Sequence, residues 1–311
     1  MLRSVYTILT IFVVSVVVFA ITQIIPGNAA YMILGEYATP ERVAVLEEEL
    51  GLNDPVWIQY SDWIVGILTG NWGWSYVNER PVVDVVLPRL LRSGYLMVVT
   101  MILVTLIAIP LGVIAAVKRS SKTDFVISTG TYIGISVPEF VSGTLLVLFL
   151  GGPIFGLLPS GGYVSPSESL VEWAKHLVLP AIAMTFVLIA HVARLTRSGM
   201  IDTLTSDYVR TARLKGMSEY KVISKHALRN GLLPTITVLA LNVGYLMGSI
   251  VIVEEVFSFP GLGRLIVRAI QGRDLPVIQA TVLVAATAYV IANFAADILY
   301  SYLDPRVEVG K

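Results

Sequence analysis

The chain has 311 residues, of which 55% are hydrophobic and 14% are charged, with 22 Lys or Arg balanced by 22 Asp or Glu. Its mean hydropathy is +0.77, and a water-soluble domain of this length does not need so much apolar surface, so the composition favours a membrane protein. The absence of cysteine excludes disulfides and thiolate metal sites.

Six apolar stretches approach the ~20 residues that a helix needs to cross a bilayer. They predict an all-α integral membrane protein with spans at Tyr6–Ile25, Tyr95–Val117, Phe125–Leu150, His176–Ala193, Thr235–Val253 and Val277–Leu303. The first stretch is too long and too uniformly apolar for a cleaved signal peptide, so we interpret it as a retained helix. Prolines at Pro110-Leu111-Gly112, Pro138-Glu139 and Pro180 predict breaks inside the spans.

A polar region follows the first transmembrane helix, and we place the helix at residues 1–25 and the region at residues 26–94. Thr39-Pro40-Glu41 is typical of a helix start and Gly51 of its end. Asn53-Asp54-Pro55 predicts a turn. Clustered tryptophans beside a membrane are usually interfacial anchors, and we interpret four in this way: Trp57, Trp63, Trp72 and Trp74.

The loops between the spans differ in charge. With the N-terminus inside, the inner segments hold 14 Lys or Arg and 6 Asp or Glu, whereas the outer segments hold 8 and 12. The positive-inside rule therefore predicts that both termini are cytoplasmic and that residues 26–94 face outward.

The most basic inner segment is Asp207–Pro234, which carries six Lys or Arg and two acids. Asp207–Lys215 predicts a helix closed by Gly216, and Ser218 predicts the cap of a second helix. In that second helix one stripe is Tyr220, Ile223 and Ala227, and another is Lys221, Lys225 and Arg229. Two amphipathic helices joined by a tight bend suit either anionic lipid headgroups or a docking partner.

This segment resembles the cytoplasmic "EAA" loop of type I ABC-importer permeases, in the version of the dipeptide, oligopeptide and nickel permeases of the B-subunit kind. Ala212 and Gly216 take the small-residue positions of that motif. Arg210-Thr211 stand where the general motif has Glu-Ala, and Arg229 stands where it has proline, as in the peptide-type subgroup. The resemblance implies that this loop inserts into a groove on the ATPase subunit, which leaves it no spare volume. The coupling loop would be made of Arg210, Thr211, Ala212, Arg213, Leu214, Lys215, Gly216, Met217 and Ser218.

The resemblance continues along nearly the whole chain. Similar segments are Pro26-Gly27, Glu49–Pro55, Gly112–Ala116, His176–Pro180, Phe259–Arg264, Arg273-Asp274 and Leu303–Arg306. It implies a type-1 transmembrane core at residues 95–303, with its coupling loop at 194–234, and a cytoplasmic tail at 304–311.

The resemblance also implies the partners of this chain. They would be a homologous second permease subunit, two ATPase subunits, an extracytoplasmic solute-binding protein and membrane lipid. The complex would lie at the cytoplasmic (inner) membrane. No nucleic acid is expected. The chain lacks a GxxxxGK[ST] phosphate loop, so ATP and Mg would bind to the ATPase subunits and this chain would hold no cofactor and catalyse nothing. Peptides or a related solute would be carried.

Polar residues inside the spans leave other functions open, because an intramembrane acid is costly and often functional. The polar residues that could line a pathway inside the membrane are Glu139, Glu254, Asn293 and Asp297. Asn293, Asp297, Tyr300 and Asp304 would form one stripe on the last helix, which either lines a pathway or bonds to neighbouring helices. An ion-coupled secondary transporter using Asp297 or Glu139, or a membrane scaffold, remains the alternative. The three histidines have no metal-ligand spacing.

The charge distribution makes a testable prediction about orientation. A cysteine introduced at Ser218 should react with a membrane-impermeant reagent only after the cells are opened, because Arg194–Pro234 is expected inside. A cysteine introduced at Ser61 should react in intact cells. Labelling of the Ser218 position from outside would reverse the orientation.

Overall fold

The structure is a computed structural model that describes residues 2–24, 29–152 and 154–303. This part of the chain is helical apart from one short hairpin, and it divides into two compact units. The first unit holds the described residues up to 93 together with 260–291, and the second holds 94–259 and the described residues from 292 on. Helices α5 (Val82–Val117) and α14 (Leu275–Leu303) begin in the first unit and end in the second.

The first unit begins with helices and a two-stranded hairpin. Its elements are α1 (Leu2–Ile24), α2 (Ala29–Leu34), the 3-10 turn η1 (Gly35–Tyr37), α3 (Pro40–Glu49), α4 (Val56–Thr69), β1 (Trp74–Ser75), β2 (Arg80–Pro81) and α13 (Leu262–Gln271). The strands pair antiparallel, with Trp74 opposite Pro81. The Thr39 side chain accepts a hydrogen bond from the Arg42 amide, which confirms the predicted helix start. The turn predicted before Val56 is also confirmed.

Two groups of contacts hold the first unit together. Valines at the start of α5 pack against apolar residues of α13 and the start of α14: Val82, Val85, Val86, Leu262, Leu265 and Val277. Phe19 of α1 packs against Tyr60 and Trp63 of α4. Trp63 and Trp72 therefore have packing roles inside the unit, since Trp72 also joins the valine cluster, whereas Trp57 is 74% exposed. The anchor interpretation stays a prediction for Trp57 and Trp74.

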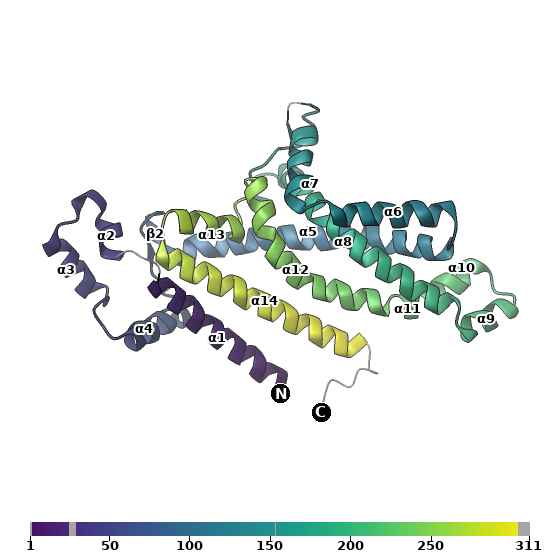
Figure 1. Ribbon diagram of the computed structural model, residues 1–311, viewed down its shortest axis with the longest axis horizontal. Helices are drawn as coiled ribbons and strands as arrows, with labels where there is room; N and C mark the ends of the chain where they lie inside the picture. Colours follow the sequence, from purple (N-terminus) through teal and green to yellow (C-terminus); the bar gives the residue numbers. More distant parts are fainter. Residues whose placement is uncertain (1, 25–28, 153, 304–311) are drawn as a thin grey trace. The chain divides into compact units, whose positions relative to one another are not determined.

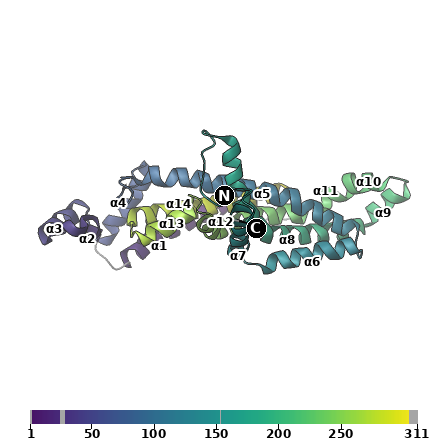
Figure 2. The ribbon, with the colours of Figure 1, turned by 90° about the horizontal axis from the view of Figure 1, so that it is seen from above.

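The second unit is built around α8 (Leu170–Leu204). The other elements are α6 (Lys122–Ser136), α7 (Glu139–Leu146), the π-helical turn η2 (Val147–Gly151), α9 (Asp207–Leu214), α10 (Glu219–Lys221), the π-helical η3 (Val222–Ala227), α11 (Leu228–Gly231) and α12 (Leu233–Val256). Helices α6, α7 and α12 all pack against α8, and α6 lies beside it in both views (Figure 1 and Figure 2). In the most apolar window of α8 61% of the residues are buried, against 22% in α12, so α8 is the central helix.

Five described helices are long and apolar enough to cross a membrane, and a sixth span requires α6 and the α7–η2 segment to act as a bent pair. That pair is bent by 99°. Val137 is extended because a residue before proline avoids the helical region, and Pro138 stands at the N-cap of α7, which begins at Glu139. The predicted break at Pro138-Glu139 is confirmed, and the span predicted at Phe125–Leu150 corresponds to this bent pair.

Two other predicted breaks are absent, since α5 continues through Pro110 and α8 through Pro180. A proline removes one backbone hydrogen bond, and packing inside a helix bundle can offset that loss; Pro180 is buried. The second and fourth spans are also longer than predicted. Helix α5 begins at Val82 rather than Tyr95, and the 35 residues of α8 rise about 52 Å, well beyond a hydrocarbon core of about 30 Å.

A glycine allows α5 to approach α8 closely. A Cβ atom at Gly112 would lie 2.5 Å from Cβ of Thr196 and 2.6 Å from the carbonyl oxygen of Ala193. Both distances are far below a van der Waals contact, and the carbonyl is backbone that cannot rotate away. Small residues at such crossings are what lets helices pack in a membrane.

The Gly112→Ala variant should therefore destabilise the second unit by about 1–3 kcal/mol through overpacking. We expect a lower melting temperature of the purified protein in detergent. Gly94→Ala in the same helix is the matched control, because no atom lies within 4 Å of the new methyl group. Equal melting temperatures for the two variants would contradict the close contact.

Candidate functional site

The basic loop, defined here as residues 207–231, follows directly from the central helix. Helix α8 ends at Leu204 and α9 begins at Asp207. Helices α9 and α10 project beyond the end of α8, and α11 returns the chain alongside α8 (Figure 1 and Figure 2). A force applied to this loop is therefore applied to the end of α8.

The basic loop has a small apolar core of its own. Val209, Ala212 and Val222 are buried together, with Leu204 and Met217 packed against them. Ala212 is only 6% exposed, so its methyl group faces the core and not a partner. Its small size thus serves the packing of α9, and its role in a coupling loop stays a prediction.

Arg213 joins three parts of the chain. Its Nη2 lies 2.7 Å from Oε1 of Glu219, its Nε donates to Oε2 at 3.2 Å, and its Nη1 donates to the carbonyl oxygen of Leu204. The hydrogen bond from Arg213 lowers the pKa of the Glu219 carboxyl below its usual value. This pair bridges α9 and α10 and also satisfies a carbonyl in the last turn of α8.

The bend between α9 and α10 needs glycine for its backbone conformation and not for space. Gly216 has φ +77°, and no atom lies within 4 Å of the position of a Cβ. Ser218 stands at the N-cap of α10, as predicted, but its hydroxyl makes no capping hydrogen bond.

The second helix of the loop departs from the predicted apolar stripe, whereas Lys221, Lys225 and Arg229 of the predicted basic stripe are all exposed. Residues 222–227 are π-helical, and the buried positions are Val222 and Ala227, while Tyr220 is 80% exposed. A wider helical turn changes which residues share a face, so the stripe Tyr220–Ile223–Ala227 is wrong. Leu214 is also 80% exposed. Two large apolar side chains thus stand out among basic ones, a pattern typical of an interface.

The remaining predicted loop residues lie on the surface or at its edge. Arg210, Thr211, Lys215 and Ser218 are exposed, and Met217 is half-buried against the small core. Apart from Ala212, the predicted coupling residues are therefore accessible.

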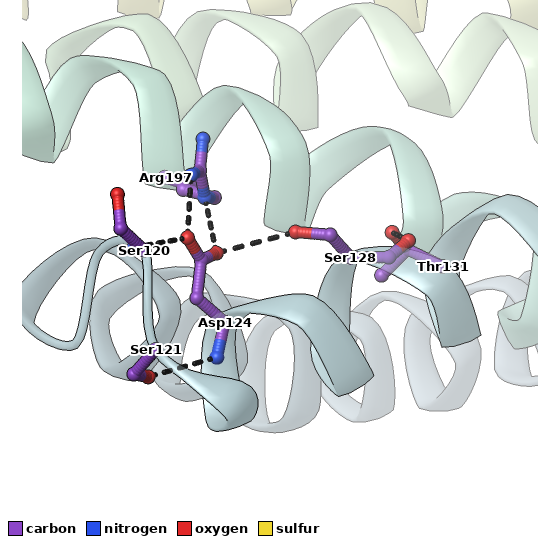
Figure 3. A network of polar contacts seen from close by, with 6 residues as sticks. All are labelled: Ser120, Ser121, Asp124, Ser128, Thr131 and Arg197. Atoms are coloured by element: carbon purple, nitrogen blue, oxygen red, sulfur yellow. Dashed lines mark hydrogen bonds and ion pairs between the residues drawn. The ribbon is translucent and has the colours of Figure 1, made fainter.

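An ion pair fixes α8 to α6 near the same end. Arg197 of α8 donates two hydrogen bonds of 2.7 Å to the two carboxylate oxygens of Asp124 (Figure 3). The Asp124 carboxylate also accepts from the Ser120 amide at 2.9 Å and from the Ser128 hydroxyl, and Ser121 caps α6. The sequence analysis missed this pair, although Asp124 in the first turn of a helix capped by Ser121 was a visible signal.

Polar groups also gather between α7 and α12. Glu139 is 8% exposed and accepts a 3.2 Å hydrogen bond from the Tyr245 hydroxyl. Asn242 and Ser249 are buried on α12, and with Tyr245 they follow an i, i+3, i+7 pattern that the sequence analysis did not use. The structure therefore brings Glu139 to a polar stripe on α12.

The other polar candidates lie apart from this group or outside the description. Glu254 is fully buried near the end of α12, where its carbonyl oxygen accepts from the Phe259 amide at 2.8 Å. Asn293 is half-buried on α14. The side chains of Asp297 and Tyr300, and the whole of Asp304, lie outside the described part, so the predicted stripe on the last helix stays a prediction.

Comparison with known families assigns almost the whole chain. Residues 108–309 match the family "Binding-protein-dependent transport system inner membrane component", and residues 1–93 match "Binding-prot-dependent transport system membrane comp, N-term".

Individual relatives are similar over their full length. The dipeptide transport system permease protein DppB of Alkalihalophilus pseudofirmus is 38% identical, with 94% of each chain covered. The glutathione transport system permease protein GsiC of Salmonella choleraesuis is 37% identical, covering 96% of this chain and 94% of GsiC. A probable peptide ABC transporter permease of Sinorhizobium fredii is 38% identical, covering 98% and 97%.

A solved structure supports the fold. A chain of the inward-facing MetNI methionine ABC transporter aligns with a TM-score of 0.58 at 15% identity, covering 71% of this chain and 96% of that one. The type I importer transmembrane fold predicted from the sequence is confirmed.

The ion pair in Figure 3 makes a prediction. Asp124→Asn removes the charge that Arg197 faces and should cost about 1.5–3 kcal/mol, because charge-assisted hydrogen bonds are the stronger kind. We expect a lower melting temperature of the purified chain. Lys122→Gln, an exposed change in the same turn of α6, is the control and should leave the melting temperature unchanged. An unchanged melting temperature of the Asp124→Asn variant would show that the ion pair contributes nothing to stability.

Proposed function

This chain belongs to the family of binding-protein-dependent inner-membrane transport components, and we propose that it is the permease subunit for short peptides or closely related solutes. The ion-coupled transporter that the sequence left open is not retained, because the matched families are components of binding-protein-dependent systems. The relatives named for dipeptide, peptide and glutathione transport support the substrate class, since all three names describe peptide chemistry.

The proposal for coupling rests on one observation, the exposed apolar tip of the basic loop. Leu214 and Tyr220 are each 80% exposed on a loop whose own core is already packed, so they are available to a partner. A groove on a cytoplasmic ATPase subunit suits this tip better than lipid headgroups, because headgroups do not require a rigid bend at Gly216. Two ATPase subunits would bind ATP and Mg, and this chain would perform no hydrolysis.

The basic loop is also connected to the membrane-spanning helices, so that its movement would be transmitted to them. Movement of the tip would pass through Arg213 to the end of α8, and through the Asp124–Arg197 pair to α6. Reorientation of these helices against a homologous second permease would alternate the access of the pathway. An extracytoplasmic binding protein would deliver the solute on the opposite face, and both termini would be cytoplasmic.

Substitution of Leu214 tests the coupling role. Leu214→Ser removes an exposed apolar side chain without touching the core of the loop, so the permease should keep its melting temperature. We expect loss of most ATP-driven peptide uptake in proteoliposomes, together with reduced co-purification of the ATPase subunits. A minority of interface residues, mostly in well-packed central positions, cost more than about 1 kcal/mol of binding free energy when truncated, and Leu214 at the tip of the loop is expected to be one of them.

The control is the same change at another exposed leucine. Leu157 is 70% exposed in the segment between η2 and α8, which is expected on the outer side, so Leu157→Ser should retain the ATPase subunits. Normal uptake by Leu214→Ser with its ATPases still bound would remove the basic loop as the coupling element. Ala212→Arg is unsuitable for this test, because it would disrupt the core around Val209 and Val222.

A further inference from the structure

The first unit encloses a cavity of about 730 Å³ that has no part in the coupling route. Its walls come from the end of α1, the α3–α4 turn, the β-hairpin and the junction of α13 with α14. The volume falls within the ~300–1,000 Å³ typical of small-molecule sites. It is also larger than one protruding side chain of a partner protein requires, so a whole small solute is the better fit.

The wall of this cavity is strongly acidic. Four carboxylates line it against a single cation, Arg273; they are Glu47, Asp54, Asp62 and Asp274. Low-dielectric walls that carry one sign of charge concentrate ligands of the opposite sign. Among the described residues no three His, Cys, Asp or Glu converge as a metal site, so the electrostatics favour an organic cation.

Among the four carboxylates, Asp274 is the one that the structure holds buried in a defined position. It is only 4% exposed, and its Oδ2 accepts a short hydrogen bond from the Ser75 hydroxyl. Its other oxygen, Oδ1, is buried and has no hydrogen-bond partner among the residues that the structure describes. Asp274 directly precedes α14, whose N-terminal dipole offsets part of the cost of the buried charge. A buried carboxylate oxygen without a partner is still costly, and because Asp274 lines the cavity, a small rotation of its side chain would let a donor there satisfy it.

The remaining lining suits an amine attached to an amide. The rings of Trp63, Trp74 and Tyr76 line the cavity and can face a cation. Burial and the charge of Asp274 raise the pKa of Tyr76, so its hydroxyl stays a neutral donor. The side-chain NH2 group of Gln59 donates to the carbonyl oxygens of Leu52 and Asp54, and that of Gln279 donates to the Thr22 hydroxyl, so these two residues offer a solute chiefly their side-chain oxygens as acceptors.

We propose that this cavity binds the protonated amino group of a short peptide, with Asp274 as the anchoring carboxylate. The identity of the solute rests on the proposed function, whereas the preference for a cation rests on the cavity alone. The site lies in the region that the charge distribution places outside the membrane. A peptide would therefore meet it before entering the spans.

Tryptophan fluorescence tests this site directly, because Trp63 and Trp74 line the cavity. The full chain in lipid nanodiscs, without a binding protein, is titrated with L-alanyl-L-alanine up to about 10 mM, which saturates a site of millimolar affinity. We expect a saturable change in emission. N-acetyl-L-alanyl-L-alanine, which lacks the charged amine, should bind about tenfold to a hundredfold more weakly, as expected for one charge-assisted hydrogen bond.

Two variants and the acetylated peptide complete the experiment. Asp274→Asn should weaken binding of the free dipeptide to the level of the acetylated one. Glu48→Gln, beside Glu47 on α3 but not part of the cavity wall, should bind like the unchanged chain. Because the acetylated peptide needs no mutation, the result does not depend on whether Asp274→Asn folds.

The opposite results are equally clear. The proposal would be overturned if the free dipeptide caused no fluorescence change, or if both peptides bound with equal affinity. The absence of any change is the result expected if the cavity instead receives a side chain of a partner protein. Failure here, combined with loss of uptake in Leu214→Ser, would leave the proposed function standing. Normal dipeptide binding combined with normal uptake in Leu214→Ser would instead remove the coupling role of the basic loop.

Discussion

The second unit depends on the burial of α8 between α6, α7 and α12. A helix of 35 residues is longer than the membrane is thick, so one element can pack inside the bundle and still carry structure outside it. The close contact at Gly112 and the ion pair at Arg197 both fix this helix to its neighbours. The basic loop then continues from its end, so under the proposed function a contact made by the loop would act directly on this central helix.

The lack of water in the hydrocarbon core explains where the chain departs from regular helices. Each backbone polar group there needs a partner within the protein, and so irregular backbone is confined to protected positions. The break at Pro138 lies where Glu139 is buried and bonded to Tyr245, and α7 packs against α8. The cavity of the first unit differs from this break, because its irregular backbone belongs to hairpin and turn residues, which form part of the walls and supply polar groups.

Several features of the fold and site could be predicted because their signals are local. The cap at Thr39, the turn before Val56 and the break at Pro138 each depend on a few neighbouring residues. The helical content and the approximate spans follow from apolar runs that have no stable alternative in a bilayer. The basic loop was found because its charge contrasts with apolar surroundings.

By itself, the sequence determined the membrane class, the order of the spans and the place of the basic loop, since composition, periodicity and charge act over short distances. Only the tertiary structure decided that Ala212 faces inward, that the polar stripe opposite Glu139 lies on α12, and that Asp124 meets Arg197. It also brought Ser75 to Asp274 across most of the chain. Apart from the packing of Ala212, these contacts join residues far apart in sequence, and their partners are fixed by how helices pack, which no local pattern encodes.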